Sequence, residues 1–252
     1  MRLIDRQVIP TFSGQLCNAR AKALQDSEEF DGVIHALERI GSYLSEKISH
    51  LKGYENALTQ IAKCSALAND IPSKWPQCHN SFSELYEMVR NARNDAVHQG
   101  AFARHLTDHA VELSLILEDA LRQSLDNPVV ADYMIRNPIC AELWQPISFI
   151  RQQMLANSFS FLPVRKAEGW HLISDLQIVE YLGSDKMRRN ERLSTSLEES
   201  GITLQAARIC NGDTPLTDAI AVLDGDPRPL LVGLKNRNEM VLLGIVTAFD
   251  LL

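Results

Sequence analysis

Apolar side chains recur at helical spacing through the first half of the chain. Between residues 11 and 125 they fall three or four positions apart, the pattern of amphipathic helices. We expect helices over about 12–23, 30–53, 54–68, 82–98 and 106–121, with a loop at 69–76 where Pro and Asn interrupt the pattern. Helices joined by short connections predict an all-α bundle.

The pattern changes at Asp126-Asn127-Pro128. Beyond this point short β-like apolar runs alternate with short helices, so we place a domain boundary here. The predicted fold class is α+β with two domains, an N-terminal all-α helical bundle over 1–126 and an α/β domain over 127–252.

The second domain contains an internal repeat. Three landmarks recur at offsets of 69, 68 and 73 residues: Gln145-Pro146-Ile147 with Thr214-Pro215-Leu216, Leu162-Pro163-Val164 with Leu230-Leu231-Val232, and Leu172-Ile173-Ser174 with Ile245-Val246-Thr247. Nearly constant offsets indicate a duplication. The copies cover about 130–183 and 202–252, and each reads strand, helix, strand, strand, helix, with Pro at the first helical position. A long spacer, 183–201, separates them.

The second copy ends in Gly244-Ile245-Val246-Thr247-Ala248-Phe249-Asp250. A hydroxyl at a strand end and a carboxylate one turn later can both bond the two hydroxyls of a ribose, and a helix N-terminus nearby can receive phosphate. In the first copy Ser174 keeps the hydroxyl, but Gln177 stands where Asp250 would be.

The duplication and this motif resemble the tandem CBS-domain pair, or Bateman module, which commonly binds adenosine nucleotides between its repeats. The resemblance implies an adenosine nucleotide (AMP, ADP, ATP or a related compound) as a regulatory ligand. It implies one good site, using Thr247 and Asp250 with contributions from Thr214 and Leu231, and a weak or empty site at Ser174. The other interpretation is a scaffold that serves only dimerisation.

Arg93, Asn94 and His98 close the helix predicted before Gly100. An imidazole can take and give a proton near neutrality, and a guanidinium forks onto phosphate oxygens. Asn94 and His98 lie about 40° apart on a helix, whereas Arg93 and His98 lie about 140° apart. Either the helix breaks after Val97, or the site is shared with a second subunit, which we favour. Alternatively, the helix dipole alone accounts for cations near a C-terminus.

The Arg-x4-His pattern late in a small all-α domain resembles the HEPN superfamily. That resemblance implies a homodimeric, metal-independent endoribonuclease acting on RNA. In this reaction His98 would transfer protons, Arg93 would stabilise the phosphorane and Asn94 would orient either partner. The resemblance also suggests a toxin-like role. The competing hypothesis is a non-catalytic adenosine-nucleotide sensor whose helical domain binds a protein partner, with Arg93 and His98 serving as dimer contacts.

Composition narrows these possibilities. The net charge of −7 excludes a general nucleic-acid binder, so any RNA contact must be local, through Arg90, Arg93 and Arg104.

The sequence has neither an apolar run long enough for a membrane span nor a signal peptide, so a cytoplasmic location is expected. The five cysteines are scattered, which predicts reduced thiols. No metal site is expected, because His105 and His109 have helical ligand spacing but no obvious third ligand; a metal enzyme is a distant alternative.

Overall fold

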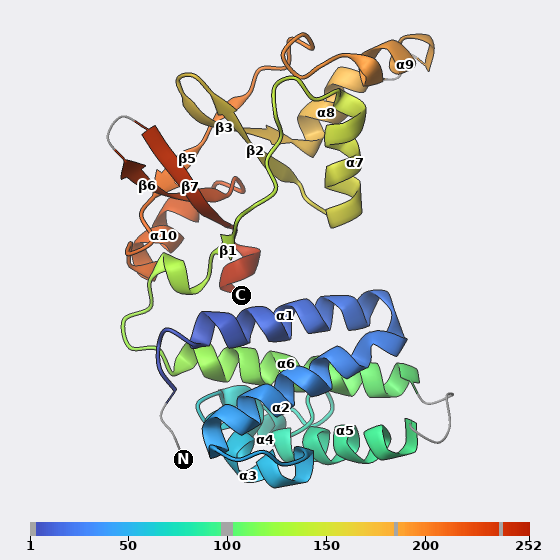
Figure 1. Ribbon diagram of the computed structural model, residues 1–252, viewed down its shortest axis with the longest axis vertical. Coiled ribbons are helices and arrows are strands. Elements are labelled where there is room, and N and C mark those ends of the chain that lie inside the picture. Colours follow the sequence, from blue (N-terminus) through green and yellow to red (C-terminus); the bar gives the residue numbers. More distant parts are fainter. Residues whose placement is uncertain (1–3, 97–102, 184–185, 237–238) are drawn as a thin grey trace. The chain divides into compact units, whose positions relative to one another are not determined.

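The computed structural model describes residues 4–96, 103–183, 186–236 and 239–252 (Figure 1). Contacts within the chain divide it into two compact units, Met1–Asp126 and Asn127–Leu252, which are taken in turn below.

Unit 1 is helical. Its longer helices are α1 (Ile9–Gln25), α2 (Asp31–Ser45), α3 (Leu51–Ala62), α5 (Phe82–Ala96) and α6 (Ala103–Gln123). Between them lie the short helix α4 (Asp70–Lys74) and the 3-10 turns η1 (Ser27–Phe30) and η2 (Ala66–Ala68). The apolar stripes of the longer helices meet in one core around Leu16, Leu37 and Leu117, all fully buried. The predicted bundle is therefore observed, and the apolar stripes of α1, α5 and α6 fall where the sequence places them.

The prediction of one helix over 30–53 was wrong. Glu46 adopts a left-handed conformation with φ of 55°, which ends α2, and the backbone N–H of Glu46 donates to the Ser42 carbonyl. Ile48, which falls within that predicted helix, is 98% exposed in the connection. Leu51 belongs instead to the start of α3, where it is buried. The third helix likewise ends at Ala62 and not at Ala68, and η2 follows it.

The connection at 69–76 is not wholly a loop. Residues Asp70–Lys74 form α4, and Pro72 is its third residue. A proline is tolerated there because the first N–H groups of a helix have no intrahelical acceptor. Pro72 is also buried, so the turn packs against the bundle.

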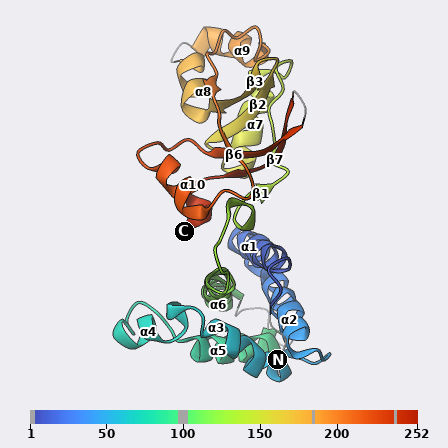
Figure 2. The ribbon, with the colours of Figure 1, turned by 90° about the vertical axis from the view of Figure 1, so that its left-hand side faces the viewer.

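Unit 2 contains two sheets (Figure 2). Its first copy comprises η3 (Val130–Asp132), β1 (Ile135–Arg136), α7 (Ile147–Asn157), β2 (Phe161–Lys166), β3 (Gly169–Ser174) and α8 (Asp175–Leu182). The second comprises β4 (Gln205–Ala206), β5 (Arg208–Cys210), α10 (Leu216–Leu223), β6 (Leu230–Asn236), β7 (Glu239–Val246) and η4 (Phe249–Leu251). One sheet has the order β1-β7-β6-β5, and the other has the order β2-β3-β4.

The two copies exchange their first strands. β1 of the first copy pairs antiparallel with β7, Ile135 opposite Ile245, and β4 of the second copy pairs antiparallel with β3, Gln205 opposite Leu172. The loops before the first helices are exchanged in the same way: Val130 N donates to the Thr214 carbonyl at 3.0 Å, and Leu197 N donates to the Gln145 carbonyl at 2.9 Å. Each sheet is therefore completed by a segment of the other repeat.

Two details of the repeat differ from the prediction. Pro146 and Pro215 are the N-cap residues, one position before the first helical residue of α7 and α10, because both adopt extended ψ angles. The spacer 183–201 is not a plain linker, since it contains helix α9 (Lys186–Ser194). The Arg192 guanidinium in α9 donates to the carbonyls of Tyr181 and Leu182 at the end of α8, which holds α9 against the first repeat.

Candidate functional site

The strand register of β6 and β7 fixes which side chains face the other repeat. Leu231 and Ile245 lie opposite each other and are buried with Leu172 of β3, between the two sheets. Leu230 and Val246, one position along, pack on the opposite face, in the cluster that contains α10 (Figure 2). Thr247 follows directly after Val246, the last residue of β7, and so stands at the end of the strand whose Ile245 packs between the sheets.

Thr247 and Asp250 are in direct contact. Asp250 Oδ2 accepts hydrogen bonds from the Thr247 backbone N at 2.7 Å and from Thr247 Oγ1 at 2.8 Å. Both residues are half-buried at the end of β7, where η4 begins. The sequence analysis expects both groups to bond the hydroxyls of a ribose, and that role stays a prediction.

The corresponding pair in the first repeat is neutral. The Ser174 backbone N donates to Gln177 Oε1 at 2.9 Å, and Gln177 N donates back to Ser174 Oγ at 3.2 Å, a reciprocal helix cap. The Gln177 Nε2 donates to the carbonyl of Thr203, which leads into β4. Ser174 is only 5% exposed. The amide of Gln177 is thus hydrogen-bonded within the protein on both sides, and the weak or empty first site stays a prediction.

The other two residues predicted at the site have structural contacts. Leu231 is fully buried between the sheets, so its side chain can form only the apolar floor of a site there. Thr214 lies in the loop before α10, and its carbonyl accepts from Val130 N. The Thr214 hydroxyl is hydrogen-bonded to the Cys210 thiol, whose pKa is raised mainly by burial and lowered in part by this bond.

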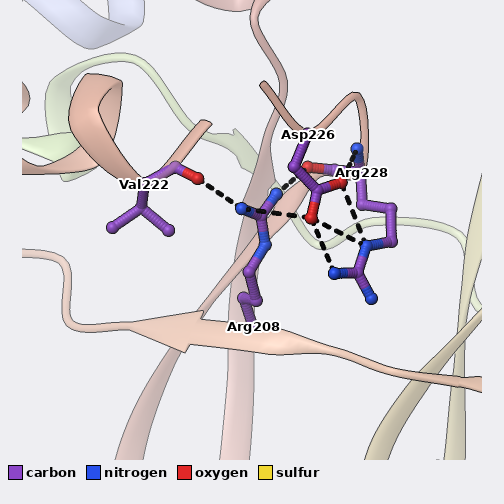
Figure 3. A network of polar contacts seen from close by, with 4 residues as sticks. All are labelled: Arg208, Val222, Asp226 and Arg228. Carbon is purple, nitrogen blue, oxygen red and sulfur yellow. Dashed lines mark hydrogen bonds and ion pairs between the residues drawn. The ribbon is translucent and has the colours of Figure 1, made fainter. Parts of the chain in front are cut away.

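A polar network that the sequence analysis missed lies at the β5 edge of this sheet (Figure 3). Arg208 of β5 donates from Nη2 to the Arg228 carbonyl at 2.6 Å and from Nη1 to the Val222 carbonyl, with Nη1 3.4 Å from Asp226 Oδ2. Arg228 Nη2 lies 2.6 Å from the same carboxylate oxygen. Arg208 is opposite Leu230 in parallel register, so it points to the α10 face, away from Thr247.

This network acts on the turn between α10 and β6. Hydrogen bonds from Arg228 and the nearby charge of Arg208 hold the pKa of Asp226 well below its ordinary value. The sequence signal was faint, because Asp226 and Arg228 are adjacent in a turn but Arg208 is remote in sequence. We assign the network to fixing the turn and not to ligand binding.

In unit 1 the structure places Arg93 against α2. Arg93 Nη1 is 3.1 Å from Glu38 Oε1, with the two side chains 34% and 24% exposed. Arg90, one turn earlier, pairs with Glu55 of α3 at 2.9 Å. The backbone of Asn94 lies in α5, but its side chain, His98 and the side chain of Arg104 lie outside the described residues. The proximity of Arg93 to His98 therefore stays a prediction.

Within the described ranges, no group of three or more His, Cys, Asp or Glu side chains is placed to hold a metal ion. His109 lies on α6, whereas the side chain of His105 is outside the described residues. All five cysteines are free thiols. A search of the described helices finds none with the length and apolarity that a membrane span requires.

No family model matches the chain, and no curated protein matches it. Among solved structures, the chain is similar to a CBS domain-containing protein of unknown function from Bacillus anthracis (16% identity, 51% of this chain and 93% of that chain, TM-score 0.42). It is similar to the CBS-pair protein CBSX2 from Arabidopsis thaliana (16% identity, 50% and 92%, TM-score 0.39). It is also similar to CbpB in complex with c-di-AMP (21% identity, 50% and 82%, TM-score 0.38). At these identities and TM-scores, a function for this chain has to come from its own residues.

Proposed function

We propose that the protein is a metal-independent endoribonuclease regulated by an adenosine nucleotide bound to unit 2. The observation that carries the regulatory half is the contact between Thr247 and Asp250 at the end of β7, the strand whose Ile245 packs between the two sheets. An ionised carboxylate is an acceptor only, so a ribose that presents two neighbouring hydroxyl donors is a fitting ligand for it. The exchanged strands make each sheet depend on both repeats, so a ligand at this edge also affects how the repeats pack.

The ligand would act by shifting a population. A nucleotide that binds one arrangement of the repeats better than another favours that arrangement by its differential affinity. Coupling of about 1–3 kcal/mol, typical of such linkage, corresponds to about 5- to 150-fold in affinity for a second ligand. The activity that changes with this arrangement is the proposed RNA cleavage by the helical unit, which works as a homodimer.

The proposed reaction needs no metal, because RNA supplies its own nucleophile. His98 takes the proton from the 2′-hydroxyl, whose oxygen attacks the phosphorus while the bond to the 5′-oxygen breaks. The imidazolium then returns a proton to that leaving oxygen, so the products are a 2′,3′-cyclic phosphate and a 5′-hydroxyl. Arg93 stabilises charge on the phosphorane, and Asn94 orients either partner. One guanidinium nitrogen of Arg93 is 3.1 Å from Glu38, and a guanidinium has further N–H donors that can bond phosphate oxygens.

The test is cleavage of a labelled RNA oligonucleotide by the full chain, with and without EDTA. We expect cleavage that resists the chelator and leaves a 2′,3′-cyclic phosphate. His98→Ala should lower the cleavage rate by about 10²- to 10⁴-fold, the usual contribution of general acid–base catalysis. His79→Ala is the matched control, since His79 is an exposed histidine of the same unit. Full activity of His98→Ala, or cleavage abolished by EDTA, would refute this assignment.

A second candidate function is a non-catalytic nucleotide sensor whose helical unit binds a protein partner. The ion pairs of Arg90 with Glu55 and of Arg93 with Glu38 favour it, because they connect α5 to α3 and α2 as structural arginines do. Nucleotide binding without RNA cleavage at any adenosine nucleotide would support this candidate over the ribonuclease.

A further inference from the structure

Helices α1 and α2 enclose a groove of about 270 Å³ in unit 1. The two helices approach closely at its floor, where a Cβ added to Gly32 would lie 3.6 Å from Ala19 Cβ. Its polar lining comes from one stripe of each helix and from the turn between them: Gln15, Asn18 and Lys22 on α1, His35 and Arg39 on α2, and Glu29 in η1.

The cations of this groove differ from the arginines around it. Arg20 is held by Glu118 at 3.1 Å, and Arg90 and Arg93 are held by Glu55 and Glu38. By contrast, Lys22 and Arg39 have no ion pair within the part of unit 1 that the structure describes. Glu29 is the carboxylate among the described residues of this lining, so Lys22 and Arg39 together leave the groove with a net positive charge in a chain whose net charge is −7.

The groove also contains an unsatisfied amide. Gln15 Oε1 is covered from solvent and has no hydrogen-bond partner among the residues that the structure describes. A covered polar atom without a partner is unfavourable, so a ligand toward which this amide can turn gains a hydrogen bond that the empty groove lacks. Phosphate oxygens accept from Lys, Arg and amide N–H groups, and the hydroxyl of a phosphorylated sugar donates to an amide oxygen.

We propose that the α1–α2 groove is a binding site for the phosphate groups of a phosphorylated ligand, clamped between Lys22 and Arg39. Asn18 and His35 supply further donors, and Gln15 selects a ligand that carries a hydroxyl. The phosphate can come from a free phosphorylated compound or from an RNA strand. The site uses none of the residues assigned above to nucleotide sensing or RNA cleavage, so it stands or fails independently of both.

The experiment measures binding to the full chain carrying Asp250→Ala, which weakens the nucleotide site of unit 2. Pyrophosphate is titrated by calorimetry at low ionic strength, and a fluorescent ten-nucleotide RNA is titrated by anisotropy. K22A/R39A is compared with K52A/K74A, which removes the same charge from exposed lysines elsewhere in unit 1. We expect K22A/R39A to weaken binding at least about 10-fold, and K52A/K74A to remain within about twofold, because the clamp and not the net charge holds the phosphate.

Binding of pyrophosphate identifies a small phosphorylated ligand, whereas binding of the RNA alone identifies a strand. Absence of binding by both, or equal losses in the two double variants, would overturn the proposal. Circular dichroism confirms that each variant is folded. Gln15→Met, which keeps the side-chain volume, provides a second reading: it should weaken RNA binding a fewfold while leaving pyrophosphate, which has no hydroxyl, unaffected.

Discussion

Replacing Asp250 with alanine should weaken adenosine-nucleotide binding by about 30- to 140-fold. The carboxylate is the group that would accept from the ribose hydroxyls, and hydrogen bonds to a charged group contribute about 1.5–3 kcal/mol. A loss of about 2–3 kcal/mol converts to that range of dissociation constants at about 1.4 kcal/mol per decade. Isothermal titration calorimetry of the full chain with AMP, ADP and ATP measures the change directly.

A competing cause has to be separated from this one. Asp250 also accepts from the Thr247 backbone N, so Asp250→Ala removes this backbone hydrogen bond as well as a ligand contact. Gln177→Ala removes the equivalent hydrogen bond in the first repeat, where Gln177 accepts from Ser174 N, and it should leave nucleotide affinity within about twofold. Asp250→Asn keeps an acceptor for the Thr247 N–H but loses the charge, and we expect an intermediate affinity.

A ligand lacking both ribose hydroxyls completes the argument. 2′,3′-Dideoxyadenosine triphosphate should bind the parent chain about as weakly as ATP binds Asp250→Ala, and the variant should no longer distinguish the two ligands, because the interaction is already absent. An Asp250→Ala protein that binds ATP within twofold of the parent, or a parent chain that binds both ligands equally, would refute the ribose clamp.

Three further predictions concern the scaffold. Gly41→Ala should destabilise unit 1 by about 1–3 kcal/mol in urea unfolding, since its Cβ would lie 2.5 Å from Tyr54 Cβ, whereas Gly14→Ala, with nothing within 4 Å, should be neutral or stabilising. Burial raises the pKa of Cys140 to about 11, so at pH 8 iodoacetamide should label it far more slowly than the exposed cysteines; equal rates would contradict this. The lowered pKa of Asp226 adds stability that is complete above the unfolded pKa of about 3.9 and is lost as pH falls toward the folded pKa. In a plot of Tm against pH, Asp226→Asn should therefore reduce the fall of Tm at acid pH. An unchanged fall would contradict a contribution from these ion pairs.

The helical unit could be predicted from the sequence wherever burial alone decided the conformation. The stripe of α1, from Phe12 through Leu16, has one helical solution that buries it. The reversal at Glu46 could not be predicted, because a glutamate carries no preference for the left-handed conformation that ends α2. The apolar period continued through Ile48 by coincidence, and only tertiary packing showed that Ile48 is exposed.

The second unit could be predicted for a different reason. A duplication constrains both copies at once, so the landmarks at Leu172 and Ile245 indicated matching strands even though each run is short. The exchange of β1 and β4 between the sheets has no local sequence signal, since strand pairing is decided by distant partners. The Arg208 network was missed for the same reason, whereas Thr247 and Asp250 could be proposed as one site because they lie within one turn of each other in the sequence.

The difference between the two repeats suggests where ligand dependence resides. Gln177 carries a donor and an acceptor, and the protein uses both, on Thr203 and on Ser174, so the first repeat satisfies this position internally. Asp250 offers only acceptors, and its Oδ2 binds the amide and hydroxyl of Thr247. A charged acceptor gains most from additional donors, and a ribose brings two. Under the proposed function, one amide in place of one carboxylate assigns the nucleotide response to the second repeat and leaves the first repeat as a constant part of the scaffold.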